Sequence, residues 1–277
     1  MDAADATVLI TGSTDGLGKV VARRLAEAGA RVLLHGRSRE KGERVLAELR
    51  AATGNRRLEY YQADFASLDQ VRALATAVAG GHERLDVLIN NAGVGFGRDR
   101  GRREVSGDGY ELRFAVNHLA GYLLTALLLP TLIRSGPARI VNVASAGQHA
   151  IDFSDVMLEH GYEGTRAYRQ SKLAQVMTTF GLAEELKDAG VTVNCLHPGT
   201  YMDTRMVTEA GIAPLSSVED GASAVIHLAT APELAGCTGL YFDRMRPARA
   251  HAQAYDRQAR RRLRALSDEL TKLPVTG

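Results

Sequence analysis

Short apolar runs recur along the chain, separated by longer segments in which apolar residues follow a helical period. The runs are rich in Val, Ile and Leu, and they lack the alternation of a strand that has one face in solvent. Such runs are typical of parallel strands that are covered on both faces. The pattern predicts about seven strands, at residues 8–10, 32–34, 58–62, 87–89, 140–143, 191–193 and 240–242.

The segment between the first two strands predicts a helix that packs on the sheet. Leu17, Val21, Leu25 and Ala28 share one face at helical spacing, and Gly29 stands where a left-handed C-terminal cap is needed. Strands and helices alternate in this way as far as residue 242, and no linker interrupts them. The pattern therefore predicts one α/β domain over residues 1–277, built as a doubly wound parallel sheet with helices on both faces.

The chain after Asp243 has a different character. Tyr255, Ala259, Leu266 and Leu270 are spaced for one face of a helix whose other face is rich in arginine. We predict a helical tail over residues 244–272 that belongs to the same domain. Aspartates are interspersed among its arginines, which is typical of a solvated helix face rather than of a nucleic-acid interface. The arginines of residues 98–103 predict an exposed loop for the same reason.

The composition is that of an ordinary globular protein, with 45% hydrophobic residues, 24% charged residues and a formal net charge of +2. So small a charge does not favour nucleic acid as a partner. Cys195 and Cys237 lie far apart and have no metal-ligand spacing, which favours a reducing cytoplasm and no metal site. His118, His149 and His197 also lack ligand spacing, so we interpret them as structural or surface residues.

No segment predicts export or a membrane span. Residues 1–7 are acidic and short, unlike a signal peptide. The longest apolar stretch, residues 122–133, is too short to cross a bilayer and contains Thr125 and Pro130. We expect a buried or interface helix there, in a cytoplasmic protein whose partner is a small molecule. The sequence leaves a homo-oligomer open.

A glycine-rich turn follows the first strand and leads into the first helix. It reads Thr11-Gly12-Ser13-Thr14-Asp15-Gly16-Leu17-Gly18. Because the glycines carry no side chains, backbone N–H groups and the helix N-terminus can approach a pyrophosphate, whose charge the helix dipole stabilises. Glycines alone often form only a tight turn, but the flanking strand and helix favour a dinucleotide site at residues 12–18.

The end of the second strand is where a dinucleotide site discriminates at the adenosine ribose. It reads His35-Gly36-Arg37-Ser38-Arg39, with no acidic residue to accept from a free 2′-hydroxyl. The planar guanidinium of Arg37 can pair with a 2′-phosphate, so we favour NADP(H) over NAD(H). The alternative is that these arginines are solvated loop charges.

A tyrosine and a lysine lie one helical turn apart, at Tyr168 and Lys172. A nearby ammonium favours the phenolate and lowers the tyrosine pKa towards working pH. Alone, such a pair more often covers apolar surface. However, Ser145 and the Asn-Asn-Ala-Gly run of residues 90–93 follow strands at the carboxyl edge where ligands bind, and Asn117 lies in another apolar helix.

With these motifs in order along nearly the whole chain, the sequence resembles the short-chain dehydrogenase/reductase family in its single-domain branch, which implies a Rossmann fold. The resemblance matches the family's catalytic tetrad to Asn117, Ser145, Tyr168 and Lys172. It also implies a set of residues that contact the cofactor. Beyond the glycine turn and Arg37, these are Asp64, Phe65, Asn91, Ala92, Gly93, Tyr168, Lys172, Pro198, Gly199 and Thr200.

The resemblance implies an oxidoreductase that transfers a hydride between nicotinamide and a substrate carbon. Tyr168 then exchanges a proton with the substrate oxygen, to which Ser145 hydrogen-bonds. Lys172 holds the nicotinamide ribose and lowers the pKa of Tyr168, and Asn117 organises a water-linked proton path. Two other functions stay open: a lyase or epimerase that uses transient oxidation, and a non-catalytic dinucleotide-binding sensor.

Within the family, the long gap from Ser145 to Tyr168, residues 171–174, residues 197–199 and the tail around residues 263–270 resemble the retinol-dehydrogenase-like branch. Arg264 departs from it, since that branch commonly has Trp there, and Thr204 stands one position later than the usual threonine. Because both departures are expected near the substrate, the resemblance does not extend to a retinoid as the substrate of this chain.

The substrate pocket is expected between Ser145 and Tyr168 and in a loop over residues 200–215, because these segments flank the nicotinamide end. Four side chains in the loop predict an apolar lining. They are Tyr201, Met202, Met206 and Val207. We expect a moderately large hydrophobic ketone, aldehyde or alcohol as the substrate.

Overall fold

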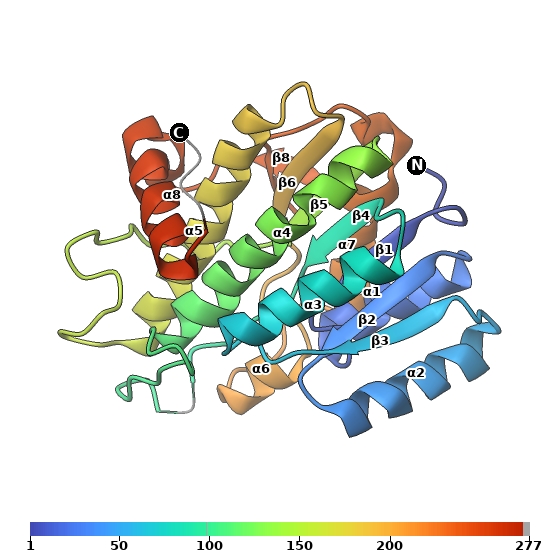
Figure 1. Ribbon diagram of the computed structural model, residues 1–277. Coiled ribbons are helices and arrows are strands. Elements are labelled where there is room, and N and C mark those ends of the chain that lie inside the picture. Colours follow the sequence, from blue (N-terminus) through green and yellow to red (C-terminus); the bar gives the residue numbers. More distant parts are fainter. Residues whose placement is uncertain (98, 274–277) are drawn as a thin grey trace.

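The fold is built on one eight-stranded sheet, seen in a computed structural model that describes residues 1–97 and 99–273 (Figure 1). The strand order is β3-β2-β1-β4-β5-β6-β7-β8, and the first seven strands are parallel. The strands are β1 Thr7–Ile10, β2 Arg31–Gly36, β3 Leu58–Gln62, β4 Val87–Asn90, β5 Ala138–Val143, β6 Val191–His197, β7 Tyr241–Asp243 and β8 Arg246–Ala248. The order reverses direction between β1 and β4, where such sheets open a crevice for ligands.

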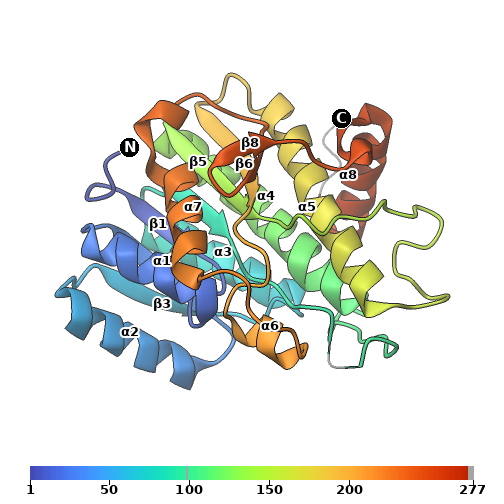
Figure 2. The same cartoon turned by 180° about the vertical axis from the view of Figure 1, so that it is seen from behind.

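Helices cover both faces of the sheet, as predicted. They are α1 Gly16–Glu27, α2 Arg39–Thr53, α3 Leu68–Gly81, α4 Ala120–Ser135, α5 Gly164–Glu185, α6 Arg205–Glu209, α7 Val218–Thr230 and α8 Arg257–Thr271, with the π-helix η1 Phe114–Leu119 and the 3-10 helices η2 Pro232–Leu234 and η3 Ala252–Tyr255. On one face α1, α2 and α7 bury a cluster that includes Val21, Val225 and Leu228 (Figure 2). On the other face lie α3, α4 and α5, with α8 packed against α5 (Figure 1).

Consecutive residues of a strand contribute to opposite faces of the sheet. In β1, Val8 and Ile10 belong to the cluster beneath α1, α2 and α7, whereas Leu9 belongs to the cluster beneath α3, α4 and α5. In β2, Leu33 likewise belongs to the second cluster, between neighbours that belong to the first. Because both faces are covered, the runs of residues 8–10 and 32–34 are apolar at every position.

The C-terminal tail differs from the predicted continuous helix. The seven predicted strands are present, but β8 is an eighth strand, antiparallel to β7, and η3 follows it. The α8 helix begins only after Asp256, whose carboxylate accepts hydrogen bonds from the backbone N–H groups of Gln258 and Ala259. Tyr255 therefore lies outside α8 and is 46% exposed, so placing it on the buried face of that helix was wrong.

The first helix differs from its predicted stripe in one position. Leu17, Val21 and Leu25 are buried, but Ala28 is the exposed C-cap residue of α1. Gly29 adopts the left-handed conformation, with φ of +87°, as the sequence predicted. The prediction for Ala28 was wrong because the helix ends at Glu27, before another turn can bring residue 28 to the sheet.

The apolar segment expected at residues 122–133 is part of a longer helical stretch. Because η1 continues into α4, the stretch Phe114–Ser135 has 22 residues, long and apolar enough to cross a membrane by length and composition. Of its most apolar 18-residue window, 61% is buried inside the protein, and α4 packs against α3. Core helices can be equally long and apolar, and the burial of this stretch agrees with the expected buried helix.

Candidate active site

Four strands end in polar or glycine-containing turns at one edge of the sheet. Parallel pairing of β1 with β4, of β4 with β5 and of β5 with β6 brings their carboxyl ends together. Thr11 follows β1, Asn91 follows β4, Ser145 lies two residues after β5, and Pro198 follows β6. The turns that the sequence singled out therefore share one edge, where ligands bind in open α/β sheets.

The glycine turn is held against the turn after β4. The hydroxyl oxygen of Thr11 accepts from the backbone N–H groups of Asn91 and Ala92, both at 2.9 Å. Asn91 Nδ2 donates to the carbonyl oxygens of Thr11 at 2.8 Å and of Gly12 at 3.1 Å. Gly12 has φ of +65°, and a Cβ there would lie 2.8 Å from the Cα of Ala92. Gly18 has no more room, since its Cβ would lie 2.3 Å from the Gly12 carbonyl oxygen.

The side chains of the turn are mostly engaged within the protein. Ser13 is buried, and its hydroxyl accepts from His35 N. Leu17 is buried in the core. Asp15 caps the N-terminus of α1 and pairs with Lys41, which together with the Gly16 N–H holds the pKa of Asp15 below its usual value. A phosphate at this turn would therefore meet backbone N–H groups, as the glycines predict.

His35 is a residue whose part in this site the sequence analysis missed. Its Nδ1 accepts from the Gly12 N–H at 3.1 Å, and its Nε2 lies 3.1 Å from the Ala63 carbonyl oxygen. Its ring stacks on Phe65 at 4.4 Å between centroids. Burial lowers the pKa of His35 to about 4, so the imidazole is neutral at pH 7. A buried histidine at the end of the second strand was the only signal, and it specified no partner.

The predicted adenosine end has two exposed arginines, Arg37 and Arg39. Arg37 follows β2 and is exposed, and within residues 1–97 and 99–273 no carboxylate forms an ion pair with its guanidinium. Asp64 is half-buried after β3, where its carboxylate accepts from the Ala66 N–H at 2.9 Å. Phe65 is buried against His35. These three residues lie at the ends of neighbouring strands, as predicted.

The four residues of the predicted tetrad come from three elements. Ser145 follows β5, Tyr168 and Lys172 lie on α5, and Asn117 lies in η1. Lys172 Nζ is 5.8 Å from the centre of the Tyr168 ring. Ser145 lies close enough to Tyr168 to lower the pKa of the phenol, and its hydroxyl accepts from the Gly147 N–H at 3.0 Å.

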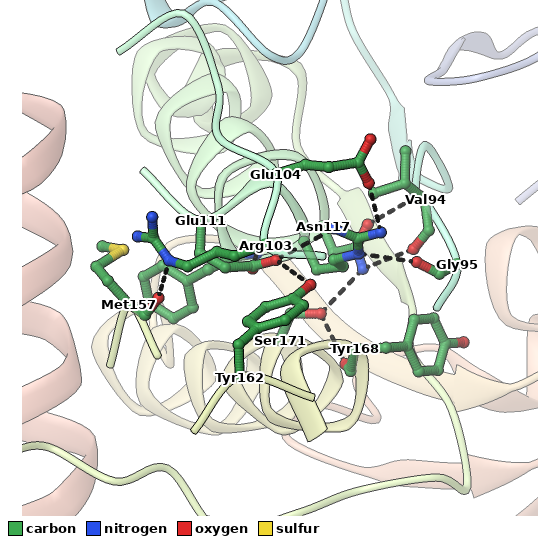
Figure 3. Close-up of polar contacts among 12 residues, drawn as sticks. Val94, Gly95, Arg103, Glu104, Glu111, Asn117, Met157, Tyr162, Tyr168 and Ser171 are labelled. Carbon is green, nitrogen blue, oxygen red and sulfur yellow. Dashed lines mark hydrogen bonds and ion pairs between the residues drawn. The ribbon is translucent and has the colours of Figure 1, made fainter. Parts of the chain in front are cut away.

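Asn117 holds the turn after β4 rather than pointing at Tyr168. Its Oδ1 accepts from Val94 N at 2.7 Å, and its Nδ2 donates to the Val94 carbonyl oxygen at 3.1 Å and to Ser171 Oγ at 2.9 Å. Ser171 in turn donates to the Tyr168 carbonyl oxygen at 2.7 Å (Figure 3). The amide therefore joins η1, the turn after β4 and the helix that carries Tyr168.

Burial dominates the pKa values of the acid/base pair. It raises the pKa of Tyr168, against the lowering effect of the Ser145 hydrogen bond, and it lowers the pKa of Lys172 to about 7. Lys172 Nζ donates to the Val143 carbonyl oxygen at 2.9 Å and to Gln175 Oε1 at 2.8 Å. The expected lowering of the Tyr168 pKa by Lys172 is not found, because Lys172, with its pKa lowered to about 7, loses its proton before Tyr168 titrates.

The loop after β6 folds over the glycine turn. His197 Nε2 lies 3.0 Å from Thr200 Oγ1, and a Cβ on Gly199 would lie 2.9 Å from Ser216 Oγ. A Cβ on Gly16 would lie 3.3 Å from the methyl carbon of Thr204. The expected loop of residues 200–215 therefore reaches the glycine turn through Thr204 and contains the short helix α6.

Apolar side chains flank Tyr168, and the sequence analysis had named only some of them. Phe96 packs edge-on against the Tyr168 ring at 4.7 Å between centroids. Met206 contacts the turn after β4, since a Cβ on Gly95 would lie 2.7 Å from its Cγ. Tyr201, with φ of +44°, lies close enough to raise the pKa of Tyr168. Phe96 was missed because it stands in a glycine-rich turn without a period.

Arg264 does not lie near the predicted substrate region. It pairs with Glu185, at the end of α5 far from Tyr168, and with Asp268 on α8. The expectation that this departure faces substrate was wrong, because Arg264 joins two helices. His118 is buried against Ser267 and His149 is exposed, as expected for structural and surface residues.

One hollow in the described part of the chain lies away from this site. Its volume is about 420 Å³, and it lies at the opposite, amino-terminal edge of the sheet beside Asp86, Arg139 and Lys187. None of the predicted site residues lines it. Within residues 1–97 and 99–273, no three His, Cys, Asp or Glu side chains are grouped to hold a metal ion.

The comparisons with known proteins agree with this geometry. A family model described as short chain dehydrogenase matches residues 6–213. Human "Retinol dehydrogenase 13" is 38% identical over 96% of this chain and 85% of its own length, and human "Retinol dehydrogenase 11" is 36% identical over 97% and 86%. A putative uncharacterized protein from Mycobacterium paratuberculosis has a similar structure, with a TM-score of 0.77 and 30% identity over 97% of this chain and 94% of that one.

A second solved structure is a short chain dehydrogenase from Shigella flexneri in complex with NADP. Its TM-score is 0.71 at 27% identity, over 88% of this chain and 99% of that one. This chain combines the glycine turn, the tetrad positions and the parallel sheet, and it is similar to these proteins over most of its length. The chain belongs to the short chain dehydrogenase family, in its retinol-dehydrogenase-like branch, and is an oxidoreductase that acts on CH–OH groups.

Proposed function

We propose that the chain transfers a hydride between NADP(H) and the carbonyl or alcohol carbon of a hydrophobic small molecule. The observation that carries the proposal is the position of Tyr168, which lies beside Ser145 and Lys172 at the sheet edge that holds the glycine turn. The curated relatives named as retinol dehydrogenases support an alcohol or carbonyl substrate. The retinoid itself is not part of the proposal.

The surface of the glycine turn suits a dinucleotide. Positions Gly12 and Gly18 have no space for a Cβ, because the turn packs closely on itself and on the turn after β4. Residues 12–18 would hold the pyrophosphate, Asp64 and Phe65 the adenine, Asn91 to Gly93 the middle of the cofactor, and Pro198 to Thr200 the nicotinamide. When bound, the nicotinamide supplies or accepts the hydride.

The chain's own side chains manage the proton. Tyr168 donates a proton to the carbonyl oxygen during reduction and removes one from the alcohol during oxidation. The Ser145 hydroxyl hydrogen-bonds to the same oxygen and holds it beside the phenol. Lys172, released from Val143 and Gln175, would hold the ribose hydroxyls and place a positive charge near the phenol, which lowers the Tyr168 pKa.

A small buried cavity supports the proposed water-linked path at Asn117. Its volume is about 20 Å³, which is enough for one water molecule, and Asn90, Asn117 and Gln175 line it. Asn90 Oδ1 is buried and has no hydrogen-bond partner among the described residues. A water there would satisfy this oxygen and lie one side chain away from Lys172, through Gln175.

The preference for NADP(H) is proposed from Arg37. Its guanidinium is exposed at the end of β2, and no acidic residue stands at residues 35–39 to accept from a 2′-hydroxyl. The NADP complex of the similar Shigella flexneri protein supports the preference. A 2′-phosphate would meet a planar donor whose charge is not already paired with a carboxylate of the described residues.

An apolar pocket is proposed for the substrate. Phe96, Tyr201 and Met206 gather around Tyr168 and the turn after β4. Such a lining favours a hydrophobic ketone, aldehyde or alcohol over a charged metabolite.

We also propose that the chain forms one domain and works in the cytoplasm, and we leave a homo-oligomer open. Cell fractionation tests the location, since recovery of the protein in the membrane fraction would contradict it.

One assay separates the proposal from its alternatives. The protein is mixed anaerobically with NADPH and a panel of carbonyl compounds, and the nicotinamide absorbance is followed. We expect loss of absorbance with a hydrophobic carbonyl. Product formed without net change in absorbance would favour a lyase or epimerase, and tight binding without any product would favour a sensor.

A further inference from the structure

A buried guanidinium lies beside the turn that packs against Tyr168. Arg113 precedes η1, and its side chain is 2% exposed. Its Nε donates to the Gly95 carbonyl oxygen at 3.1 Å, and its Nη2 donates to Glu104 at 2.8 Å. Its Nη1 lies 3.6 Å from Glu111. Burying a charge is costly unless ion pairs and hydrogen bonds offset the loss of water, so these contacts define where Arg113 lies.

The turn is fixed at two successive residues. Both backbone groups of Val94 are hydrogen-bonded to Asn117 (Figure 3). The carbonyl of Gly95 is hydrogen-bonded to Arg113. The next residue, Phe96, packs edge-on against Tyr168 with 74° between the ring planes. Only one peptide unit and one ring contact therefore separate Arg113 from the phenol.

Glu111 joins the same cluster to two helices. One carboxylate oxygen accepts from the backbone N–H of Phe114 at 2.7 Å, at the start of η1. The other accepts from the Tyr162 hydroxyl at 3.2 Å, just before α5 (Figure 3). Burial and the Glu111 charge raise the pKa of Tyr162, so this hydroxyl keeps its proton and remains a donor. The segments that carry Asn117, Phe96 and Tyr168 thus meet at one buried ion cluster.

We propose that Arg113 is a positioning residue for the active site, which holds Gly95 and Phe96 so that the Tyr168 ring has a single orientation. Arg113 also packs closely against the backbone of Gly97, where a Cβ would lie 2.4 Å from Arg113 Nη2. The effect on turnover rests on the proposed function, whereas the effect on the Tyr168 ring does not.

The test compares two buried arginines. Arg113→Met keeps an apolar stem and removes the guanidinium. Arg139→Met is the matched control, because Arg139 is also buried and donates to the carbonyl oxygens of Leu228 and Ala231 beside α7, away from the site. Each variant is labelled with 3-fluorotyrosine, and the ¹⁹F resonance of Tyr168 is identified by its loss in Tyr168→Phe.

We expect Arg113→Met to shift the Tyr168 resonance and Arg139→Met to leave it in place. Below the unfolding temperatures of both variants, Arg113→Met should lower kcat roughly 100-fold with little change in the KM for NADPH, because small displacements of a reacting group are costly. An unmoved Tyr168 resonance in Arg113→Met overturns the inference. If the wild type shows no turnover but the Tyr168 resonance shifts in Arg113→Met, the inference is supported and the proposed function is contradicted.

A second variant covers the case in which Arg113→Met does not fold. Arg113→Lys keeps a buried cation near Glu104 and Glu111, but a single ammonium lacks the planar fork that serves Gly95 and Glu104 together. The same shift of the Tyr168 resonance is expected. A Lys variant that folds and leaves the resonance unchanged overturns the inference equally.

Discussion

The charged and titratable side chains of this site differ in how far they are buried, and burial changes their pKa values. Arg37 is exposed, so its charge is available to a ligand, whereas Lys172 is buried and its pKa is lowered to about 7. Tyr168 has its pKa raised by burial. At the residue scale, single substitutions of these side chains should therefore change either cofactor binding or proton transfer.

Tyr168→Phe removes the proton donor and keeps the ring that packs against Phe96. We expect NADPH to bind with unchanged affinity and kcat to fall by about 10²- to 10⁴-fold, the usual contribution of a positioned acid/base. Fluorescence titration measures the binding, and nicotinamide absorbance measures turnover. Near-normal turnover would remove Tyr168 from its proposed role.

Arg37→Ala tests the cofactor preference. Hydrogen bonds to charged groups contribute about 1.5–3 kcal/mol, so the Kd for NADPH should rise by roughly 10- to 100-fold. The Kd for NADH should not change, since NADH has no 2′-phosphate. Arg39→Ala is the control, because Arg39 already pairs with Glu43 along α2. Equal Kd values for both cofactors in the wild type would contradict the preference.

At the scale of elements, the sequence predicted what depends on local pattern. The strands at residues 8–10 and 87–89 lie within β1 and β4, and the glycine turn lies between β1 and α1 as predicted. The contacts of His35 with Gly12, of Phe96 with Tyr168 and of Arg113 with Gly95 could not be predicted, since the two residues of each pair lie in different elements or turns and no period marks them. The tail was predicted less well because Asp256 starts α8 by a local cap that the apolar spacing does not reveal.

Helix α8 offers a comparison of two aspartates on one element. Asp268 is buried, where it accepts from the Tyr122 hydroxyl and pairs with Arg264. Asp268→Ala removes the acceptor of the Tyr122 hydroxyl, while Arg264 keeps Glu185, so the free energy of unfolding should fall by about 1.5–3 kcal/mol, as for a hydrogen bond to a charged group. Asp256→Ala removes only the N-cap and should cost about 1 kcal/mol. Urea denaturation measures both, and equal losses would show that Asp268 does no more than a cap.

At the scale of the whole molecule, the two hydrophobic clusters share one sheet, and two of the buried histidines, His35 and His118, lie at separate places around it. His35 connects the glycine turn to Phe65, and His118 packs in η1 against Ser267 of α8. Burial lowers the pKa of His35 to about 4 and that of His118 to about 3. Protonating either ring would place a charge in a buried position, so the native state as a whole should be sensitive to acid.

The sign of this dependence follows from proton binding. Between about pH 6.5 and pH 5 the unfolded chain protonates both histidines while the folded chain protonates neither, so the free energy of unfolding falls as the pH falls. Each histidine contributes a slope of about 1.4 kcal/mol per pH unit once its unfolded form is fully protonated. His118→Gln should remove one such contribution from the slope. Urea denaturation at about pH 7.5, 6 and 5 measures the slopes across the range in which unfolded histidine titrates. Parallel pH profiles for His118→Gln and the wild type would contradict a lowered pKa of His118 in the folded protein.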